Sequence, residues 1–244
     1  MRYLKILPFF FALFGLFCSS SGELEIKNSR DRFDLARNLF VEGKYVKSME
    51  NLKIIAYEKG VEYADSVQYL LAECYMTMEQ YILAASEYQD LLRFNSTSPL
   101  VPEARYKIGL CFSKISPSSD LDQNYTSRAI NELQTFIEYF PTHDRARDAE
   151  KLIIELRNKL AEKDYNTAIL YMKMNKYRSA ILYFNSVLEK FHDSSFADLA
   201  QLGIIEVYIM QDKKDLAKNE IEKFIIKYPN SKKKEEVIKL KQSI

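Results

Sequence analysis

The sequence predicts an all-α protein built from about five helix-turn-helix repeats and a C-terminal capping helix. Two observations carry this prediction. The 244 residues include only six glycines and six prolines, and 47% are hydrophobic, which is typical of a helical chain with a core rather than of a turn-rich β-sandwich. The second observation is one pattern of small and large residues that recurs at helical spacing along the chain.

The first residues are typical of a secretory signal. Arg2 and Lys5 form a short positive region before an uncharged apolar run at residues 6–17, which is shorter than the ~20 residues that span a bilayer. Cys18 follows at once and resembles the lipid-bearing cysteine of a lipoprotein, although Phe17 stands where a small residue is usual. We expect a signal peptide at 1–17, a lipidated tether at 18–28 and a solenoid domain at 29–244. Ordinary secretion with a coincidental cysteine is the alternative.

The recurring pattern defines the second helix of each expected repeat. A small residue is followed four and seven residues later by large apolar residues, and this spacing places all three on one helix face. The five sets are Ser48-Leu52-Ile55, Ala84-Tyr88-Leu91, Ala129-Leu133-Phe136, Ala180-Phe184-Val187 and Ala217-Ile221-Phe224. A first helix with its own small residue precedes four of them, at Ala36, Ala72, Gly109 and Ala168.

This is the pattern of the tetratricopeptide repeat (TPR), which has about 34 residues per helix pair. Successive small residues of the second helix are 36, 45, 51 and 37 residues apart, so the third and fourth repeats contain insertions. We expect a polar loop at 116–124 and a longer helix from 145 to 163. The expected pairs are residues 31–59, 62–94, 100–140, 145–191 and 196–228, with the capping helix from 232.

The composition argues against several classes of function. There are 35 basic and 34 acidic residues, which predicts no general attraction to nucleic acid. The chain has two histidines, no glycine-rich phosphate loop and no clustered metal ligands, so we expect no enzyme activity, cofactor or metal. Cys74 and Cys111 occupy equivalent places in neighbouring repeats, about 8–10 Å apart. A disulfide needs Cα atoms within about 7 Å, so we expect two free, buried thiols.

One segment is more specific than the repeat pattern. Residues 122–141 read DQNYTSRAINELQTFIEYFP, and they follow a lipoprotein-like start and precede a long helix. Together these features resemble the BamD (ComL) family, lipoproteins of the β-barrel assembly machinery. The resemblance implies a lipid-anchored protein on the periplasmic face of the outer membrane. Its partners would be the periplasmic domains of a BamA-like insertase and unfolded outer-membrane proteins. Another periplasmic TPR adaptor, serving the cell envelope or division, is the alternative.

Stacked repeats curve, so the first helices are expected to line a groove. Three residues before each small residue of the first helix, the sequence has Phe33, Tyr69 and Tyr106. Four residues after it, the first two repeats have Phe40 and Met76. We expect these five side chains to bind an extended apolar peptide such as an unfolded β-strand. Ordinary repeat framework is the equally weighted alternative.

Two finer expectations concern the same groove. Arg30, Arg37 and Arg105 are expected to flank it and to pair with the C-terminal carboxylate of a bound peptide. Tyr69 is expected to lie away from Tyr88 and the other contacts that hold the second repeat together, so that its removal would cost little stability.

Overall fold

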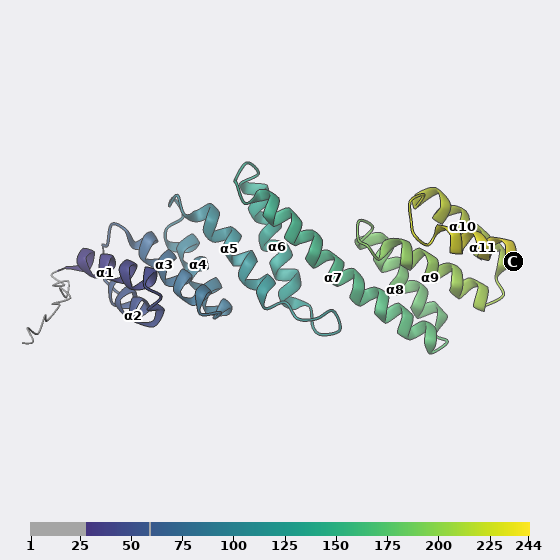
Figure 1. Ribbon diagram of the computed structural model, residues 1–244, viewed down its shortest axis with the longest axis horizontal. Helices are drawn as coiled ribbons and strands as arrows, with labels where there is room; N and C mark the ends of the chain where they lie inside the picture. Colours follow the sequence, from purple (N-terminus) through teal and green to yellow (C-terminus); the bar gives the residue numbers. More distant parts are fainter. Residues whose placement is uncertain (1–27, 59) are drawn as a thin grey trace, which may run out of the picture.

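In the computed structural model, residues 28–58 and 60–244 are described, and they form a row of α-helices arranged as successive antiparallel pairs (Figure 1). The expected signal peptide and Cys18 lie outside these residues. The pairs are α1 (Ser29–Val41) with α2 (Tyr45–Ala56), α3 (Ala64–Thr77) with α4 (Tyr81–Phe94), α5 (Val101–Lys114) with α6 (Asn124–Tyr139), α7 (Ala146–Lys173) with α8 (Tyr177–Lys190) and α9 (Ala197–Met210) with α10 (Lys214–Lys227), followed by α11 (Lys234–Ser243). The predicted all-α TPR solenoid with a capping helix is confirmed.

The small residues of the sequence pattern lie where two helices cross. Ala36, Ala72, Ala84 and Ala129 are fully buried, and so is Ser48, whose hydroxyl donates to the carbonyl oxygen of Ala36 at 2.7 Å. The large residues that follow them fill the adjacent space. The bulkiest fully buried side chains are Tyr88, Phe136, Phe184 and Phe224, all from second helices.

The turns inside the repeats explain why the helix pairs are so regular. In three of them, one non-glycine residue takes a left-handed conformation: Glu79 (φ 59°), Asn175 (φ 58°) and Asp212 (φ 55°). In the first repeat Gly43 takes the same place with φ 75°. The third repeat instead has the polar loop that its sequence predicted, between the end of α5 and the start of α6.

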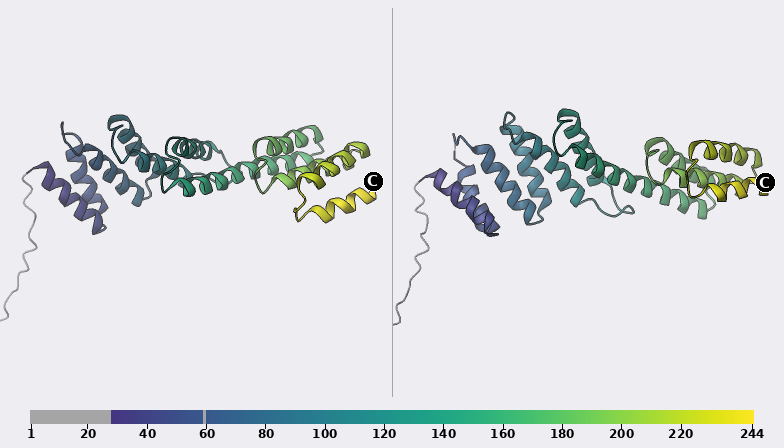
Figure 2. Two further views of the ribbon diagram at one scale, coloured as in Figure 1. Left: turned by 90° about the horizontal axis from the view of Figure 1, so that it is seen from above. Right: turned by 45° about the horizontal axis from the view of Figure 1, so that its top comes forward.

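Helix α7 has 28 residues and belongs to two parts of the molecule. Its first half, up to Leu156, is buried in one hydrophobic core with α1–α6, and its second half, from Ala161, is buried in another with α8 and α9. We call α1–α6 with the first half of α7 the N-terminal body, and the rest the C-terminal body. Two further views show α7 as the connection between them (Figure 2).

Polar contacts brace the middle of α7 on both sides. The Lys159 ammonium donates to the hydroxyl of Ser116 at 2.8 Å and to its carbonyl oxygen, and Lys163 donates to the carbonyl oxygen of Leu121. Both acceptors belong to the loop before α6. On the C-terminal side, Arg157 pairs with Asp193 at 2.7 Å in the turn after α8. The inserted loop therefore contacts the segment of helix that joins the two bodies.

Candidate functional site

A hollow of about 390 Å³ lies where the first helices of the N-terminal body meet. We call the surface formed by α1, α3 and α5 the first-helix face. The hollow is lined from α1, from α3 and from the turns that precede α3 and α5. Its lining residues are Arg30, Phe33, Arg37, Tyr63, Ser66, Tyr69, Leu70 and Leu100.

One wall of the hollow combines rings with guanidinium groups. The rings of Phe33 and Tyr63 are 5.2 Å apart, and the Arg30 guanidinium lies 5.1 Å from the Tyr63 ring. Arg37 lies 6.0 Å from the Phe33 ring. Both arginines approach the same carboxylate, that of Asp34, at 3.7 and 3.8 Å. Since one carboxylate serves two guanidinium groups, N–H donors remain available for an anionic ligand.

The opposite wall is Tyr69, and its position corrects one expectation. Its ring packs edge-on against Tyr88 at 5.7 Å, whereas the sequence placed it away from that contact. Tyr69 lies three residues before Ala72, and Tyr88 lies four residues after Ala84. These two positions face each other where α3 and α4 cross. Tyr69 is therefore both a wall of the hollow and part of the framework, and removing it will destabilise the second repeat.

A partly buried polar cluster lies next to this wall. The hydroxyl of Tyr88 donates to the Glu73 carboxylate, and the Lys107 ammonium lies 2.9 Å from the same carboxylate. Burial, followed by the nearby Glu73 charge, raises the pKa of Tyr69 well above its usual value. Tyr69 therefore remains a neutral phenol at physiological pH.

The other three predicted groove residues lie outside the hollow. Tyr106 is only 7% exposed, because its ring packs 5.6 Å from Phe136 and Arg145 lies 5.7 Å above it. Phe40 packs edge-on against Tyr45 at 5.3 Å. The Met76 sulfur lies 3.5 Å from the Cys111 sulfur. The structure thus brings Phe33 and Tyr69 together and uses Tyr106, Phe40 and Met76 in packing.

Arg105 does not flank the same surface as Arg30 and Arg37. Its guanidinium lies 3.8 Å from the Glu132 carboxylate and 5.8 Å from the Tyr139 ring, on the side of α5 that faces α6. The reason is its position four residues before Gly109. At the equivalent position of the second repeat, Gln68 donates to Glu87 of the second helix.

The sequence pattern missed several lining residues. Ser66 could have been found, because α1 and α3 present residues to this face at the same spacing of three, four and three. In α1 the residues at this spacing are Arg30, Phe33, Arg37 and Phe40, and in α3 they are Ser66, Tyr69, Glu73 and Met76. Tyr63 and Leu100 come from turns between repeats, where no periodic signal exists.

The two cysteines behave as the sequence predicted. Cys74 and Cys111 are free and fully buried. Burial raises the pKa of the Cys111 thiol to about 12 and also raises that of Cys74. Both side chains therefore act as small apolar groups beneath the first-helix face.

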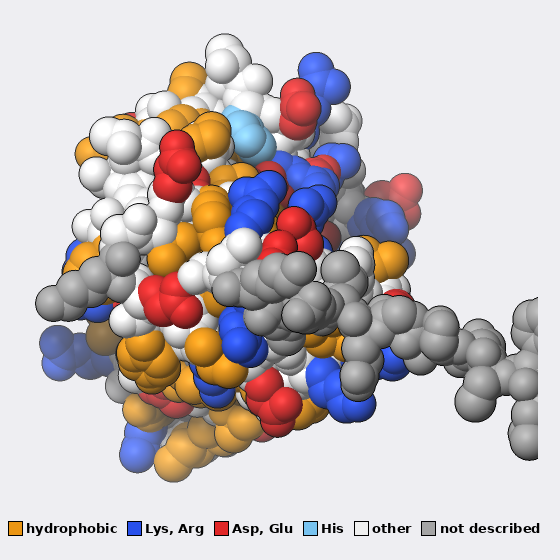
Figure 3. Space-filling view, turned by 90° about the vertical axis from the view of Figure 1, so that its left-hand side faces the viewer, with side chains coloured by type: hydrophobic (Ala, Val, Ile, Leu, Met, Phe, Trp, Pro, Cys, Tyr) orange, Lys and Arg blue, Asp and Glu red, His pale blue; other side chains and the backbone are white. Residues whose placement is uncertain are grey.

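The hollow can hold an apolar side chain beside an anionic group. Seen from the N-terminal end, basic side chains lie directly beside hydrophobic ones on the surface (Figure 3). Within the described residues, no cluster of three or more side chains is arranged to hold a metal ion. Over the same residues, no helix combines the length and apolar character needed to cross a membrane.

Comparisons with known proteins bear on the family and the fold. Residues 27–199 match the YfiO family, described as outer membrane lipoproteins, and residues 199–231 match a tetratricopeptide repeat. The outer membrane protein assembly factor BamD of Xylella fastidiosa is 30% identical over 98 residues, which cover 40% of this chain and 34% of the relative. BamD of Caulobacter vibrioides is 27% identical over 123 residues, covering 49% and 40% respectively. The matched part is therefore well under half the length of these relatives.

Solved structures show weaker similarity. The TPR2AB domain of yeast Sti1 in its pHSP90 complex has a TM-score of 0.44 at 12% identity, covering 83% of this chain and 78% of that one. The MamA protein has a TM-score of 0.37 at 17% identity, covering 82% and 92%. The family match takes in α1 to α8 and the start of α9, which is well over half of the chain. This chain belongs to the YfiO family of outer membrane lipoproteins.

Proposed function

We propose that this protein is a non-enzymatic, lipid-anchored subunit of the machinery that assembles β-barrel proteins in the outer membrane. Its relatives are named outer membrane protein assembly factors, and its family consists of outer membrane lipoproteins. In this proposal Cys18 carries the lipid, and the body lies on the periplasmic face. Unfolded barrel proteins bind at the N-terminal body, and the insertase's periplasmic domains are the second partner.

The hollow on the first-helix face is the observation that carries the substrate role. A barrel protein that ends in an aromatic residue offers a ring and a carboxylate next to each other. Phe33, Tyr63 and Tyr69 suit the ring, and Arg30 and Arg37 suit the carboxylate. The predicted groove residues Phe40, Met76 and Tyr106 pack against other side chains of the repeats and do not line the hollow.

The test uses the arginines, because Tyr69→Ala would also disturb Tyr88. Arg30→Gln and Arg37→Gln should each weaken binding of a C-terminal barrel peptide about tenfold, since a hydrogen bond to a charged group contributes roughly 1.5–3 kcal/mol. Arg178→Gln, at an exposed position of α8, is the matched control and should bind as wild type. Titration with the same peptide amidated at its C-terminus separates the carboxylate from the ring. Equal affinity of the two peptides would refute the carboxylate site.

The anchor has its own test. Cys18→Ser should move the protein from the membrane fraction to the soluble periplasm or leave it unprocessed, because the acyl chains would be lost. Unchanged partition, together with an absence of lipid label on the wild-type protein, would show that the anchor assignment is wrong.

A further inference from the structure

Three exposed aromatic side chains mark the ends of the second helices in the N-terminal body. Tyr57 directly follows α2, and Phe94 and Tyr139 are the last residues of α4 and α6. They are 87%, 71% and 67% exposed. The framework aromatics Tyr88 and Phe136, on the same helices as Phe94 and Tyr139, are fully buried. We call Tyr57, Phe94 and Tyr139 the aromatic edge.

The aromatic edge is continuous from repeat to repeat. Phe94 lines a hollow of about 210 Å³ together with Ile55 and Ala56, at the end of the preceding second helix. Tyr139 lines a hollow of about 430 Å³ together with Leu92 and Ser96, one repeat further along. The turns that follow α2, α4 and α6 lie along the upper edge of the N-terminal body in Figure 1.

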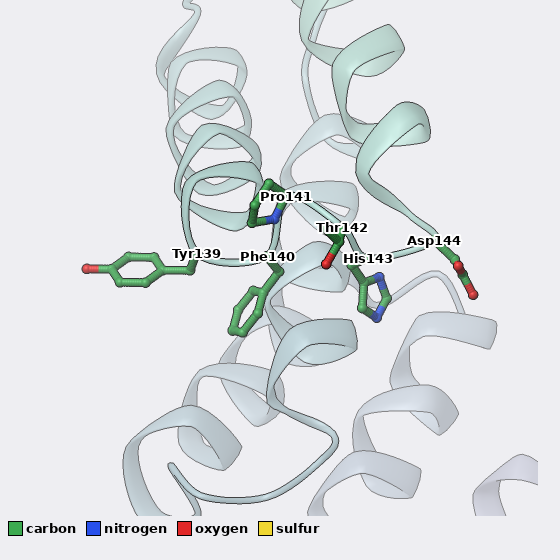
Figure 4. A pocket seen from close by; sticks show the side chains of 6 residues that line it. All are labelled: Tyr139, Phe140, Pro141, Thr142, His143 and Asp144. Atoms are coloured by element: carbon green, nitrogen blue, oxygen red, sulfur yellow. The ribbon is translucent and has the colours of Figure 1, made fainter.

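The side chain of Tyr139 shows how the edge is presented. In Figure 4 it points away from the helices, whereas Phe140 and His143 of the same turn point in another direction. Phe140 and His143 both pack against the buried ring of Phe136, at 6.0 and 5.4 Å. The turn is therefore held by its other side chains, and packing within the chain does not account for Tyr139.

Two of the three rings, Phe94 and Tyr139, have a guanidinium group beside them. Arg93 lies 4.4 Å from the Phe94 ring, and Arg105 lies 5.8 Å from the Tyr139 ring. Both arginines also pair with a carboxylate, Asp90 or Glu132, so the edge is close to neutral. Rings of this kind, with polar groups beside them, are typical of protein surfaces at the boundary between lipid headgroups and acyl chains.

The chain enters the body at this same edge. The hydroxyl of Ser29, the first residue of α1, donates to the carboxylate of Glu58, which is next to Tyr57. Cys18 lies ten residues before Asn28, so the anchor reaches at most about 35 Å from the start of the body. In the C-terminal body the last residues of the second helices are Lys190 and Lys227. Phe191 and Tyr228, which directly follow these two helices, are half-buried, so among the described second helices the exposed aromatic ends lie in the repeats near the point of attachment.

We propose that the aromatic edge rests in the headgroup region of the membrane that holds the lipid anchor. The inference depends on the proposed anchoring at Cys18 and adds an orientation to it. The three rings fix which side of the N-terminal body faces the bilayer, and the opposite ends of α2, α4 and α6 point away from it. Contact of this depth, roughly 5–10 Å, is that of an interfacial segment rather than a membrane-spanning one.

The sequence makes this directly measurable, because it contains no tryptophan. Phe94→Trp and Tyr139→Trp each introduce one fluorophore at the edge. Ile82→Trp is the matched control, since Ile82 is 57% exposed near the other end of the same helix as Phe94. The lipidated full chain is reconstituted into phosphatidylcholine vesicles containing brominated lipid. Quenching at positions 94 and 139 should be about twofold or more stronger than at position 82.

A second arm separates this proposal from the anchor itself. Mass spectrometry of the purified protein first establishes whether Cys18 is acylated. A chain with a hexahistidine tag in place of residues 1–18 is then tethered to vesicles that contain nickel-chelating lipid. Stronger quenching at 94 and 139 in this arm supports the edge even if the protein is not acylated. Equal quenching at the three positions refutes it. The fluorophores could instead be shielded by added insertase domains or by self-association and not be quenched by lipid. That result would make the edge a protein interface and would also refute the proposal.

Discussion

The same aromatic contact occurs in both bodies of the molecule, but its surroundings differ between them. In the second repeat, Tyr69 packs against Tyr88 with ring centres 5.7 Å apart. In the fourth repeat, Tyr165 packs against Phe184 at 5.8 Å. The residues of each pair are 19 positions apart in the sequence, so the contact is a property of the repeat. An aromatic residue at this position therefore does not by itself mark a binding site.

The groups that surround these rings differ between the two bodies. In the N-terminal body, Arg30 and Arg37 lie over Phe33, and the hollow beside them is open. In the C-terminal body, Tyr165 packs against Phe196 at 5.6 Å, and the fifth repeat has Leu202 in place of the aromatic residue. Cations and open volume beside the framework rings therefore distinguish the candidate site from ordinary packing.

The largest expected loss of stability comes from truncating one fully buried aromatic residue in each body. Tyr88→Ala and Phe184→Ala should each cost about 3–5 kcal/mol, because both side chains are fully buried. The bodies have separate cores joined by α7, so Phe184→Ala should unfold the C-terminal body first and leave the N-terminal body protected. Hydrogen exchange followed by mass spectrometry checks this. A single cooperative loss of protection in both bodies would show that they are one folding unit.

Substitution of one buried glycine in each body is expected to destabilise the protein less than loss of a core ring. A Cβ at Gly203 would overlap the fully buried ring of Phe184, and a Cβ at Gly109 would overlap the side chain of Leu133. A leucine can rotate more easily than a packed ring can move. We expect Gly203→Ala to destabilise by about 1–3 kcal/mol and Gly109→Ala by less. Thermal unfolding of the two variants would contradict this if Gly109→Ala had the lower melting temperature.

Two carboxylates at equivalent positions should respond to neutralisation with opposite signs. Glu73 pairs with Lys107 at 2.9 Å, so Glu73→Gln should destabilise by about 1 kcal/mol at pH 7. Glu206 is half-buried, and burial and then Glu236 raise its pKa against the opposing effect of Lys233. Folding therefore disfavours its charged form above the folded-state pKa, and that penalty is absent below the unfolded value of about 4.3.

Glu206→Gln should accordingly stabilise the protein at pH 7, by less than about 1 kcal/mol because the group is partly solvated. The gain should shrink as the pH falls and disappear below about pH 4. Melting temperatures of the wild type and both variants between neutral and acidic pH provide the measurement. A gain at Glu206 that persists at low pH would mean that electrostatics is not its cause.

The smallest effect on stability is expected for the contacts between α7 and the loop before α6. Their loss is measured as a change in the distance between the two bodies. Lys159→Ala with Lys163→Ala removes the contacts from α7 to Ser116 and Leu121, at a cost below about 1 kcal/mol. The distribution of distances between spin labels on the two bodies should nevertheless widen, because α7 then joins them without the loop. Lys151→Ala, at an exposed position of the same helix, is the control. An unchanged distribution would show that α7 alone is stiff enough.

The repeats could be predicted because their signal is local. The small residue and its partners four and seven positions later lie on one helix, and the bounds of α4, α6 and α8 follow from it within a few residues. The hollow could not be predicted in the same way. Tyr63 and Leu100 come from turns, and the contact of Tyr69 with Tyr88 depends on the crossing of two helices. The prediction that Arg105 flanks the hollow was wrong, because Arg105 pairs with Glu132, which lies beyond the inserted loop in the sequence.

The unbroken course of α7 has a mechanical consequence. The helix is about 42 Å long at 1.5 Å per residue. Arg145, the residue that precedes it, pairs with Glu103 of α5 at 3.6 Å, beside the first-helix face. The far half of the same helix forms part of the other core through Ala161 and Ala168. A tilt of about 5° at the start of α7 would displace its far end by roughly 4 Å, so the helix is a lever arm that converts a small shift near Arg145 into a visible swing of the C-terminal body.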